Sequence, residues 1–176
     1  MTQPEDDATG VRQRSKAAKE AWSQTNEDMN VIADQRREEG WNVVSMPAVH
    51  TSPVSKDQGD DDTFGLVHVI PDNHTEAFSE AFDRGEFHQY EAYRNEVDGF
   101  VYLVTELIDP DSETIVLIAS QYDLQLSRGM IESAVDEDAL YTHAKTINGT
   151  TLGSVRHEKF DPLIPGDYQS GAESDN

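Results

Sequence analysis

Cysteine is absent from this 176-residue sequence, and long hydrophobic runs are absent as well. Without cysteine, disulfide bonds, thiolate metal sites and a cysteine nucleophile are excluded. The longest uninterrupted apolar run covers residues 115–119, whereas a membrane-spanning helix needs ~20 apolar residues. The opening residues MTQPEDDATG are acidic and polar, unlike the apolar segment of a signal peptide. We therefore expect a soluble, cytoplasmic protein with no membrane association.

Positive charge is scarce. The chain has 13 Lys and Arg against 35 Asp and Glu, which gives a formal net charge of −22. Such a surplus of like charge destabilises a compact domain in dilute salt. Molar salt shortens the Debye length to about 3 Å and screens this repulsion. The composition therefore predicts a salt-adapted, halophilic protein; an acidic protein with disordered tails and a mimic of nucleic acid are the alternatives.

Sequence motifs of common enzymes are missing too. There is no Gly-rich phosphate loop, no GxSxG elbow and no dinucleotide fingerprint. His88 and Glu91 have a spacing used by carboxylate metal sites, but such sites need two of these motifs. His68 alternates with apolar residues and is expected in the core, while Ser120 and Ser154 are expected to be ordinary strand serines. We expect no metal and no cofactor.

A long helix is predicted over residues 12–39. Trp22, Thr25, Met29, Ile32 and Arg36 recur at helical spacing, and the glycine at position 40 ends the pattern. The helix has a narrow apolar stripe on an otherwise charged surface, so it lies on a neighbouring element rather than inside the core.

Shorter helices are predicted after it. Residues 73–84 form one that begins with a capping box at Asn73 and Glu76. A second short helical face is predicted over residues 90–97, and residues 128–135 form a further short helix.

Strands are predicted where apolar residues alternate or run together. They cover residues 41–50, 64–70, 100–108, 114–122, 140–147 and 150–157, with an acidic loop at 51–62. Pro47 indicates an edge strand or a bulge. The fold class is α+β: a mixed, mainly antiparallel sheet of about six strands, with the long N-terminal helix and one or two further helices packed on it. One domain at 11–165 is expected between disordered tails at 1–10 and 166–176.

The C-terminal hairpin carries the candidate site. Asn148 and Gly149 predict a two-residue type I′ turn. That turn places His143 opposite Ser154, Tyr141 opposite Arg156, and Lys145 opposite Leu152. One face of the hairpin then carries Tyr141, His143, Lys145, Ser154 and Arg156, which is suited to a small anionic ligand. The alternative is ordinary sheet surface. Residues 139–157 contain no Asp or Glu, but residues 40–56 contain none either, so the lack of acids does not mark a site.

The long helix also carries a candidate interface. Its apolar stripe, with Trp22, Met29 and Ile32, has the form of a helix-in-groove contact. The helix could dock on its own domain, which is the favoured alternative, on a sister subunit, or on a nucleic acid. Nucleic acid is the least expected partner, because the acidic body repels it and salt weakens phosphate contacts.

Three segments carry a resemblance. At FGLVHVIPDNH, VYLVTELIDPDSETIVLIA and YTHAKTINGTTLG, the chain resembles a family of uncharacterised conserved proteins from haloarchaea, over residues 40–165. No activity is assigned to that family, so the resemblance implies no site residue. We expect a binding or assembly module that self-associates or binds a protein partner. The alternative is a small-molecule enzyme that acts on an anionic substrate at the hairpin face.

Overall fold

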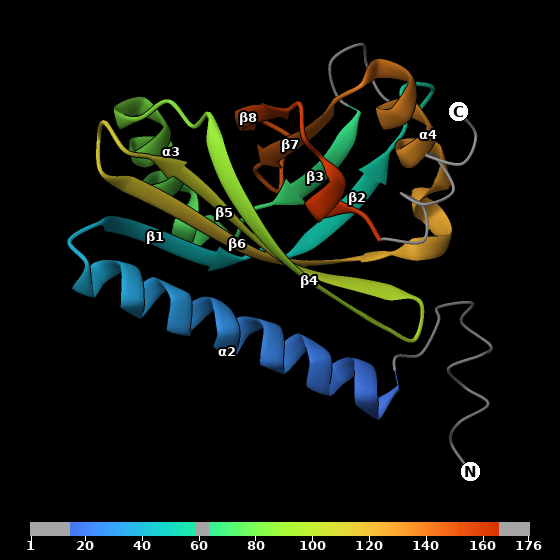
Figure 1. Cartoon of the computed structure of the whole chain (residues 1–176), viewed down its shortest axis with the longest axis horizontal. Helices are drawn as coiled ribbons and strands as arrows, with labels where there is room; N and C mark the ends of the chain where they lie inside the picture. The colour runs from blue at the N-terminus through green and yellow to red at the C-terminus, as the bar shows by residue number, and fades with distance from the viewer. Residues whose placement is uncertain (1–14, 59–63, 166–176) are drawn as a thin grey trace.

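The strands form two four-stranded sheets rather than one. The computed structural model describes residues 15–58 and 64–165 (Figure 1). The first sheet has the order β1 (Asn42–Pro47), β6 (Thr114–Asp123), β5 (Phe100–Asp109) and β4 (Gln89–Val97). The second has the order β2 (His50–Val54), β3 (Gly65–Val69), β7 (Leu140–Lys145) and β8 (Thr151–His157). Each sheet contains one parallel pair, β1 with β6 and β3 with β7. The α+β class is confirmed, and the expectation of a single six-stranded sheet is wrong.

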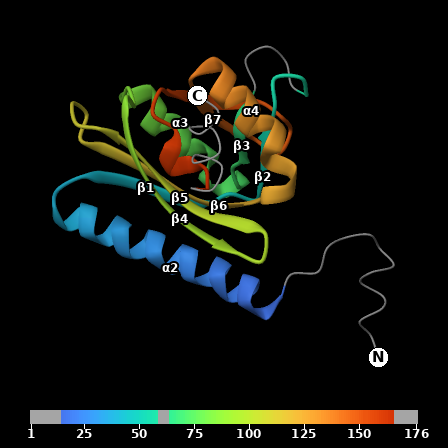
Figure 2. The same cartoon turned by 45° about the vertical axis from the view of Figure 1, so that its right-hand side comes forward.

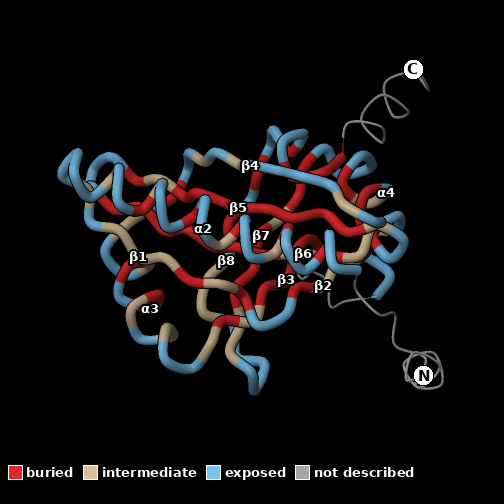
Figure 3. The backbone as a smooth tube through the Cα atoms, turned by 90° about the horizontal axis from the view of Figure 1, so that it is seen from below, coloured by how far each residue is buried: buried red, intermediate tan, exposed pale blue. Residues whose placement is uncertain are grey.

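The elements stack in layers (Figures 1 and 2). α2 (Lys16–Glu38) covers one face of the first sheet, and the second sheet covers the other face. α3 (Thr75–Arg84) and α4 (Arg128–Glu137) flank the second sheet at its two ends. Short 3₁₀ turns complete the fold: η1 (Asp72–His74), η2 (Leu124–Ser127) and η3 (Asp161–Leu163). β5 and β6 are buried along nearly their whole length (Figure 3), because both of their faces are covered.

α2 follows the predicted stripe. Its buried residues recur every three or four positions: Ala18, Ala21, Thr25, Met29 and Ala33. Ser15 caps the helix, since its Oγ accepts a hydrogen bond from the backbone N of Ala18 at 3.0 Å. Gly40 follows the last turn with φ +102°, a conformation that glycine adopts readily. The expected start at residue 12 lies outside the described residues, as do both expected tails.

The chain passes from one sheet to the other within two residues. The backbone N of Ala48 donates to Ala119 O in the first sheet, and the N of Val49 donates to Val69 O in the second, both at 2.8 Å. The predicted strand at 41–50 is therefore two strands, and the predicted loop at 51–62 is wrong over β2. Pro47 and Pro53 both lie on edge strands, where proline is tolerated because ladder hydrogen bonds form on one side only.

Residues 90–97 are a strand, not the predicted helical face. β4 pairs antiparallel with β5 from Gln89 to Val97. The turn that follows is Asp98–Gly99, with φ values of +51° and +84°. Positive φ at both positions is the requirement of a type I′ turn, so the dipeptide Asp-Gly was the missed signal.

The shorter helices begin without side-chain caps. α3 starts at Thr75 after the η1 turn, and no side chain caps its N-terminus, so the predicted capping box is wrong. The 3₁₀ turn supplies the entry instead, with His74 N donating to Pro71 O at 2.9 Å. The helix predicted at 128–135 is confirmed as α4, which buries Met130, Ile131 and Ala134.

The C-terminal hairpin has the predicted strands but a different turn. Gly149 has φ +94° whereas Asn148 keeps a negative φ, and Gly149 N donates to Thr146 O at 2.9 Å. A longer loop ending in a left-handed glycine suits the strand twist as well as a type I′ turn does. A bulge next to Lys145 then moves its partner from Leu152 to Thr151. The pairs His143 with Ser154 and Tyr141 with Arg156 lie before the bulge and are confirmed.

Candidate functional site

His143 and Ser154 are in direct contact on the hairpin. Nδ1 of His143 lies 2.7 Å from Ser154 Oγ, and its Nε2 lies 3.1 Å from the carbonyl oxygen of Phe64. A carbonyl only accepts, so Nε2 carries the proton and donates to Phe64. Nδ1 is then the acceptor for the Ser154 hydroxyl. His143 is 3% exposed and Ser154 is exposed, so a shielded imidazole contacts a serine at the surface.

The carbonyl that orients His143 is held by a close approach of two strands. Gly65 has φ +125°, and a Cβ at this position would lie 2.2 Å from Tyr141 O. Only glycine lets β3 run this close to β7. The ring of Tyr141 stacks on that of His143 with centroids 5.6 Å apart, and Phe64 meets Tyr141 edge-on at 5.2 Å. The imidazole is therefore fixed by two hydrogen bonds and a stacked ring.

The two cations of the predicted anion site lie beside this contact. Arg156 pairs with Tyr141 in the register, and its Nη1 donates to Glu158 Oε2 at 3.1 Å. Lys145 lies half-buried opposite Thr151. The structure thus joins Tyr141, His143 and Ser154 by contact and places the cations further along the same two strands.

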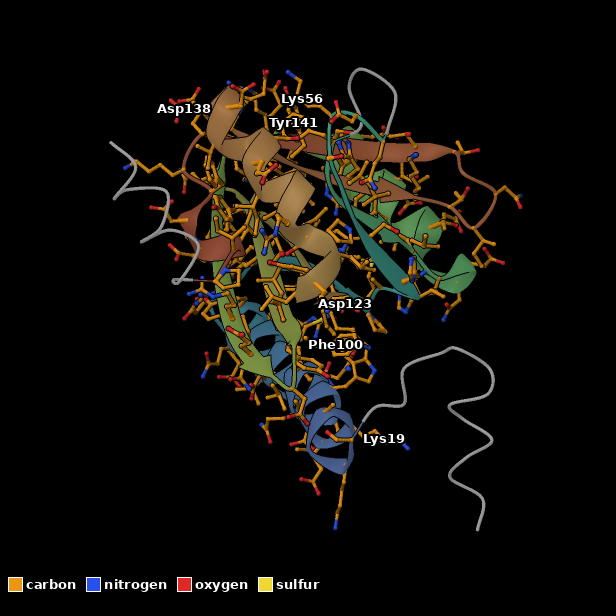
Figure 4. The ribbon with its side chains drawn as sticks, turned by 90° about the vertical axis from the view of Figure 1, so that its right-hand side faces the viewer. Lys19, Lys56, Phe100, Asp123, Asp138 and Tyr141 are labelled. Carbon is orange, nitrogen blue, oxygen red and sulfur yellow. The ribbon has the colours of Figure 1, made fainter. Side chains whose placement is uncertain are left out.

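A pocket lies elsewhere, at the end of the first sheet. Its volume is about 510 Å³, and its walls are β2 with the two residues before it, the last three residues of β6, and Gln58, Phe100 and Leu126. Figure 4 looks onto this end, with Phe100 and Asp123 between α4 above and α2 below, and Tyr141 near the top of the view. None of the five predicted ligand residues lines it.

Unequal strand lengths create the pocket. β6 has ten residues and β1 has six, and their pairing stops at Pro47 and Ala119. The chain then leaves for the second sheet, so the end of β6 and the start of β2 diverge. No local sequence pattern signals this gap, because it arises from two strands that belong to different sheets.

The pocket combines apolar and polar groups. Val49 and Leu126 are 59% and 66% exposed, which is unusual for large apolar side chains. Gln121 Oε1 is buried and has no hydrogen-bond partner within the described ranges. Asp123 Oδ1 accepts from the backbone N of Gln125 at 2.9 Å. His50 Nε2 lies 2.9 Å from Ser52 Oγ.

The predicted interface residues of α2 contact the chain's own first sheet. Met29 is buried in a cluster that includes Ile115 and Leu117 of β6. Trp22 and Ile32 are half-buried against the same cluster. The apolar stripe thus packs in cis, as the favoured alternative expects.

An ion pair also joins α2 to this sheet. Glu106 of β5 is fully buried, and its carboxylate accepts from Arg36 Nε at 2.7 Å and Arg36 Nη2 at 3.3 Å. Tyr93 Oη donates to the same carboxylate at 3.0 Å. The hydrogen bond to Glu106 raises the pKa of Arg36 well above its usual value, and burial followed by the charge of Glu106 raises the pKa of Tyr93. This network replaces the water that Glu106 loses.

Two further histidines of the second sheet are buried, in addition to His143. His68 is in the core as predicted, with Nδ1 2.8 Å from Thr51 Oγ1, and burial lowers its pKa to about 3, with a further contribution from His143 and His157. His157 Nε2 is 2.7 Å from Thr142 Oγ1, and burial lowers its pKa to about 4. Across residues 15–58 and 64–165, no group of three potential metal ligands is gathered.

Acid is expected to destabilise the protein through these two histidines. Their usual pKa is 6.5, so below that pH the unfolded chain binds protons that the folded chain excludes until about pH 4 for His157 and about pH 3 for His68. These two histidines therefore leave the free energy of unfolding unchanged above pH 6.5 and lower it as the pH falls below 6.5. Each histidine contributes a slope of about 1.4 kcal/mol per pH unit once the unfolded state is protonated. Urea unfolding as a function of pH at constant salt measures this slope.

Two variants separate the contribution of the buried histidines to the pH dependence of stability from that of the Asp and Glu residues. His157→Gln is expected to remove about one proton, or about 1.4 kcal/mol per pH unit, from the slope. His88→Gln changes an exposed histidine and is the matched control for the loss of one His side chain. Equal slopes in all three proteins would contradict the assignment.

The comparisons with known proteins identify a family and no close relative. Neither a curated protein nor a solved structure matches the chain. No helix within the described part is long and apolar enough to cross a membrane. Residues 8–165 match the family of unknown function DUF7529, and the chain belongs to that family.

Proposed function

We propose that this protein is a binding module whose ligand occupies the pocket between β2 and β6. The supporting observation is a pocket of about 510 Å³ with Val49 and Leu126 exposed beside it. Small-molecule sites are usually concave, mostly apolar and about 300–1,000 Å³ in volume, with a few polar groups that orient the ligand. Asp123 disfavours an anion there. The ligand proposed is an uncharged small molecule with an aromatic or aliphatic body.

We further propose that the module works in the salt-rich cytoplasm of a haloarchaeon. The net charge of −22 supports this proposal. Among the described Asp and Glu residues, only Glu106 and Asp109 are buried, so the acids form a hydrated surface.

Self-association is part of the same proposal. Val31 is exposed on the side of α2 that faces away from the first sheet, opposite to the half-buried Trp22. A second copy would contact this side of the helix. Sedimentation in concentrated KCl, with Val31→Asp as the disrupting variant, tests it: a monomer at every concentration would contradict it.

Binding of the uncharged dye Nile red in concentrated KCl tests the pocket. Wild type is expected to bind it with a rise in fluorescence. Leu126→Glu is expected to weaken binding about tenfold or more, because a leucine side chain that the bound dye covers contributes about 1.5–3 kcal/mol. Val135→Glu changes an exposed apolar residue of α4 outside the pocket and is the matched control. No binding, or equal weakening in both variants, would overturn the proposal.

A second candidate function, an enzyme acting at the hairpin face, is favoured by the contact between Ser154 and His143. It requires that the serine be reactive, which is a separate question from ligand binding in the pocket.

A further inference from the structure

We propose that Ser154 is a nucleophile and His143 its general base, in an acyl-transfer site on the hairpin face. This site is independent of the pocket between β2 and β6. A serine hydroxyl is a weak nucleophile unless a base removes its proton, and the base must lie about 2.6–3.2 Å away. The distance of 2.7 Å between Ser154 Oγ and His143 Nδ1 meets that requirement.

The base is oriented by a third group, as this chemistry requires. In serine hydrolases a carboxylate usually holds the second ring nitrogen and fixes the tautomer. Here the backbone carbonyl of Phe64 accepts from Nε2 at 3.1 Å and performs that role. Gly65 is the positioning residue, because any side chain there would push β3, and with it the Phe64 carbonyl, away from β7. Rotation of the imidazole would break both hydrogen bonds and the stacking with Tyr141.

The serine is accessible to a substrate, whereas the histidine is buried. Ser154 is exposed on β8, an edge strand, so a substrate can reach its hydroxyl. His143 is shielded from competing water. The contact between His50 and Ser52 provides a contrast, because that imidazole is exposed. Nothing comparable shields it as a base.

The substrate class follows from the neighbouring cation. Arg156 lies two residues beyond Ser154 on β8, and alternate residues of a strand point to the same face. A guanidinium binds a carboxylate in preference to a neutral group, and a substrate carboxylate would join or replace that of the exposed Glu158, which Arg156 Nη1 contacts at 3.1 Å. The preferred substrate is therefore an ester of a carboxylic acid that carries a second, free carboxylate.

The proposed reaction consumes the ester and one water molecule and needs no other reactant. Ser154 Oγ attacks the ester carbonyl while His143 Nδ1 takes the hydroxyl proton. The carbon–oxygen bond to the alcohol breaks, and the alcohol leaves with that proton, which forms an acyl-serine. Water then attacks the acyl group, Nδ1 takes its proton and returns it to Ser154, and the free acid is released. The Phe64 carbonyl accepts from Nε2 throughout, so it supports the imidazolium formed in each step.

A fluorophosphonate is the direct probe. Its phosphorus forms a bond to Ser154 Oγ and releases fluoride, and the mass of the intact protein in concentrated KCl reports the adduct. Wild type is expected to be labelled, and peptide mapping is expected to place the adduct on Ser154. Ser154→Ala is expected to lose labelling, and Ser23→Ala, which removes an exposed serine of α2, is expected to keep it.

Hydrolysis of p-nitrophenyl esters tests the base and the cation. His143→Gln is expected to lower the rate by a factor of about 10²–10⁴, the usual contribution of general base catalysis. Arg156→Ala is expected to lower the rate for the p-nitrophenyl monoester of succinic acid and to leave that for the acetate unchanged.

Labelling of wild type decides the proposal even if His143→Gln fails to fold. No adduct on wild type, or an adduct formed equally fast in Ser154→Ala, would overturn it. Ser154→Ala is expected to keep Nile red binding, because Ser154 does not line the pocket. Fluorophosphonate labelling therefore tests this inference, and Nile red binding tests the binding proposal separately.

Discussion

Replacing Arg36 by alanine is expected to lower the free energy of unfolding by about 3–5 kcal/mol. The reason is that Glu106 is fully buried and receives two hydrogen bonds from the guanidinium. Without Arg36, the carboxylate either stays charged in the core with only Tyr93 as a donor or becomes protonated. Urea unfolding in concentrated KCl measures the loss.

The surrounding ion pairs supply the control. Arg37 and Asp34 form an exposed pair at 3.5 Å on the same helix, and Arg37→Ala is expected to change stability by less than about 1 kcal/mol. The double variant Arg36→Met, Glu106→Leu is expected to recover most of the loss, because it removes both charges and keeps the packing. A loss for Arg36→Ala no larger than that for Arg37→Ala would contradict the network.

The melting temperature is expected to rise by roughly 10 °C between dilute buffer and about 2 M KCl. The net charge of −22 is spread over the surface and repels itself, and molar salt screens that repulsion. Each kcal/mol recovered by screening raises the melting temperature of a domain of this size by about 2–4 °C. Calorimetry across a KCl series measures it.

Charge removal separates screening from other effects of salt. Glu20, Glu27 and Glu38 are exposed on α2. Changing all three to glutamine is expected to raise the melting temperature in dilute salt. The further increase in melting temperature on adding KCl is then expected to be smaller than in wild type. A melting temperature that stays flat or falls with KCl in wild type would contradict the salt adaptation.

Local patterns in the sequence determined the elements that carry most of the fold. The helical stripe of α2 and the continuous apolar runs of β5 and β6 mark residues that are buried wherever their neighbours lie. The pairing of His143 with Ser154 was predicted from a two-residue turn that the hairpin does not have. The longer loop pairs Lys145 with Thr151, one residue away from the predicted register, and the bulge between Ala144 and Lys145 restores that register before His143.

Only the tertiary structure decided where long-range partners meet. Arg36 and Glu106 are 70 residues apart, and His143 and the Phe64 carbonyl are 79 apart. The pocket exists because the chain leaves β1, and with it the pairing to β6, after Pro47 and enters the second sheet as β2. Sequence patterns determine which side of an element is buried, whereas the packing of the whole chain determines what that side meets.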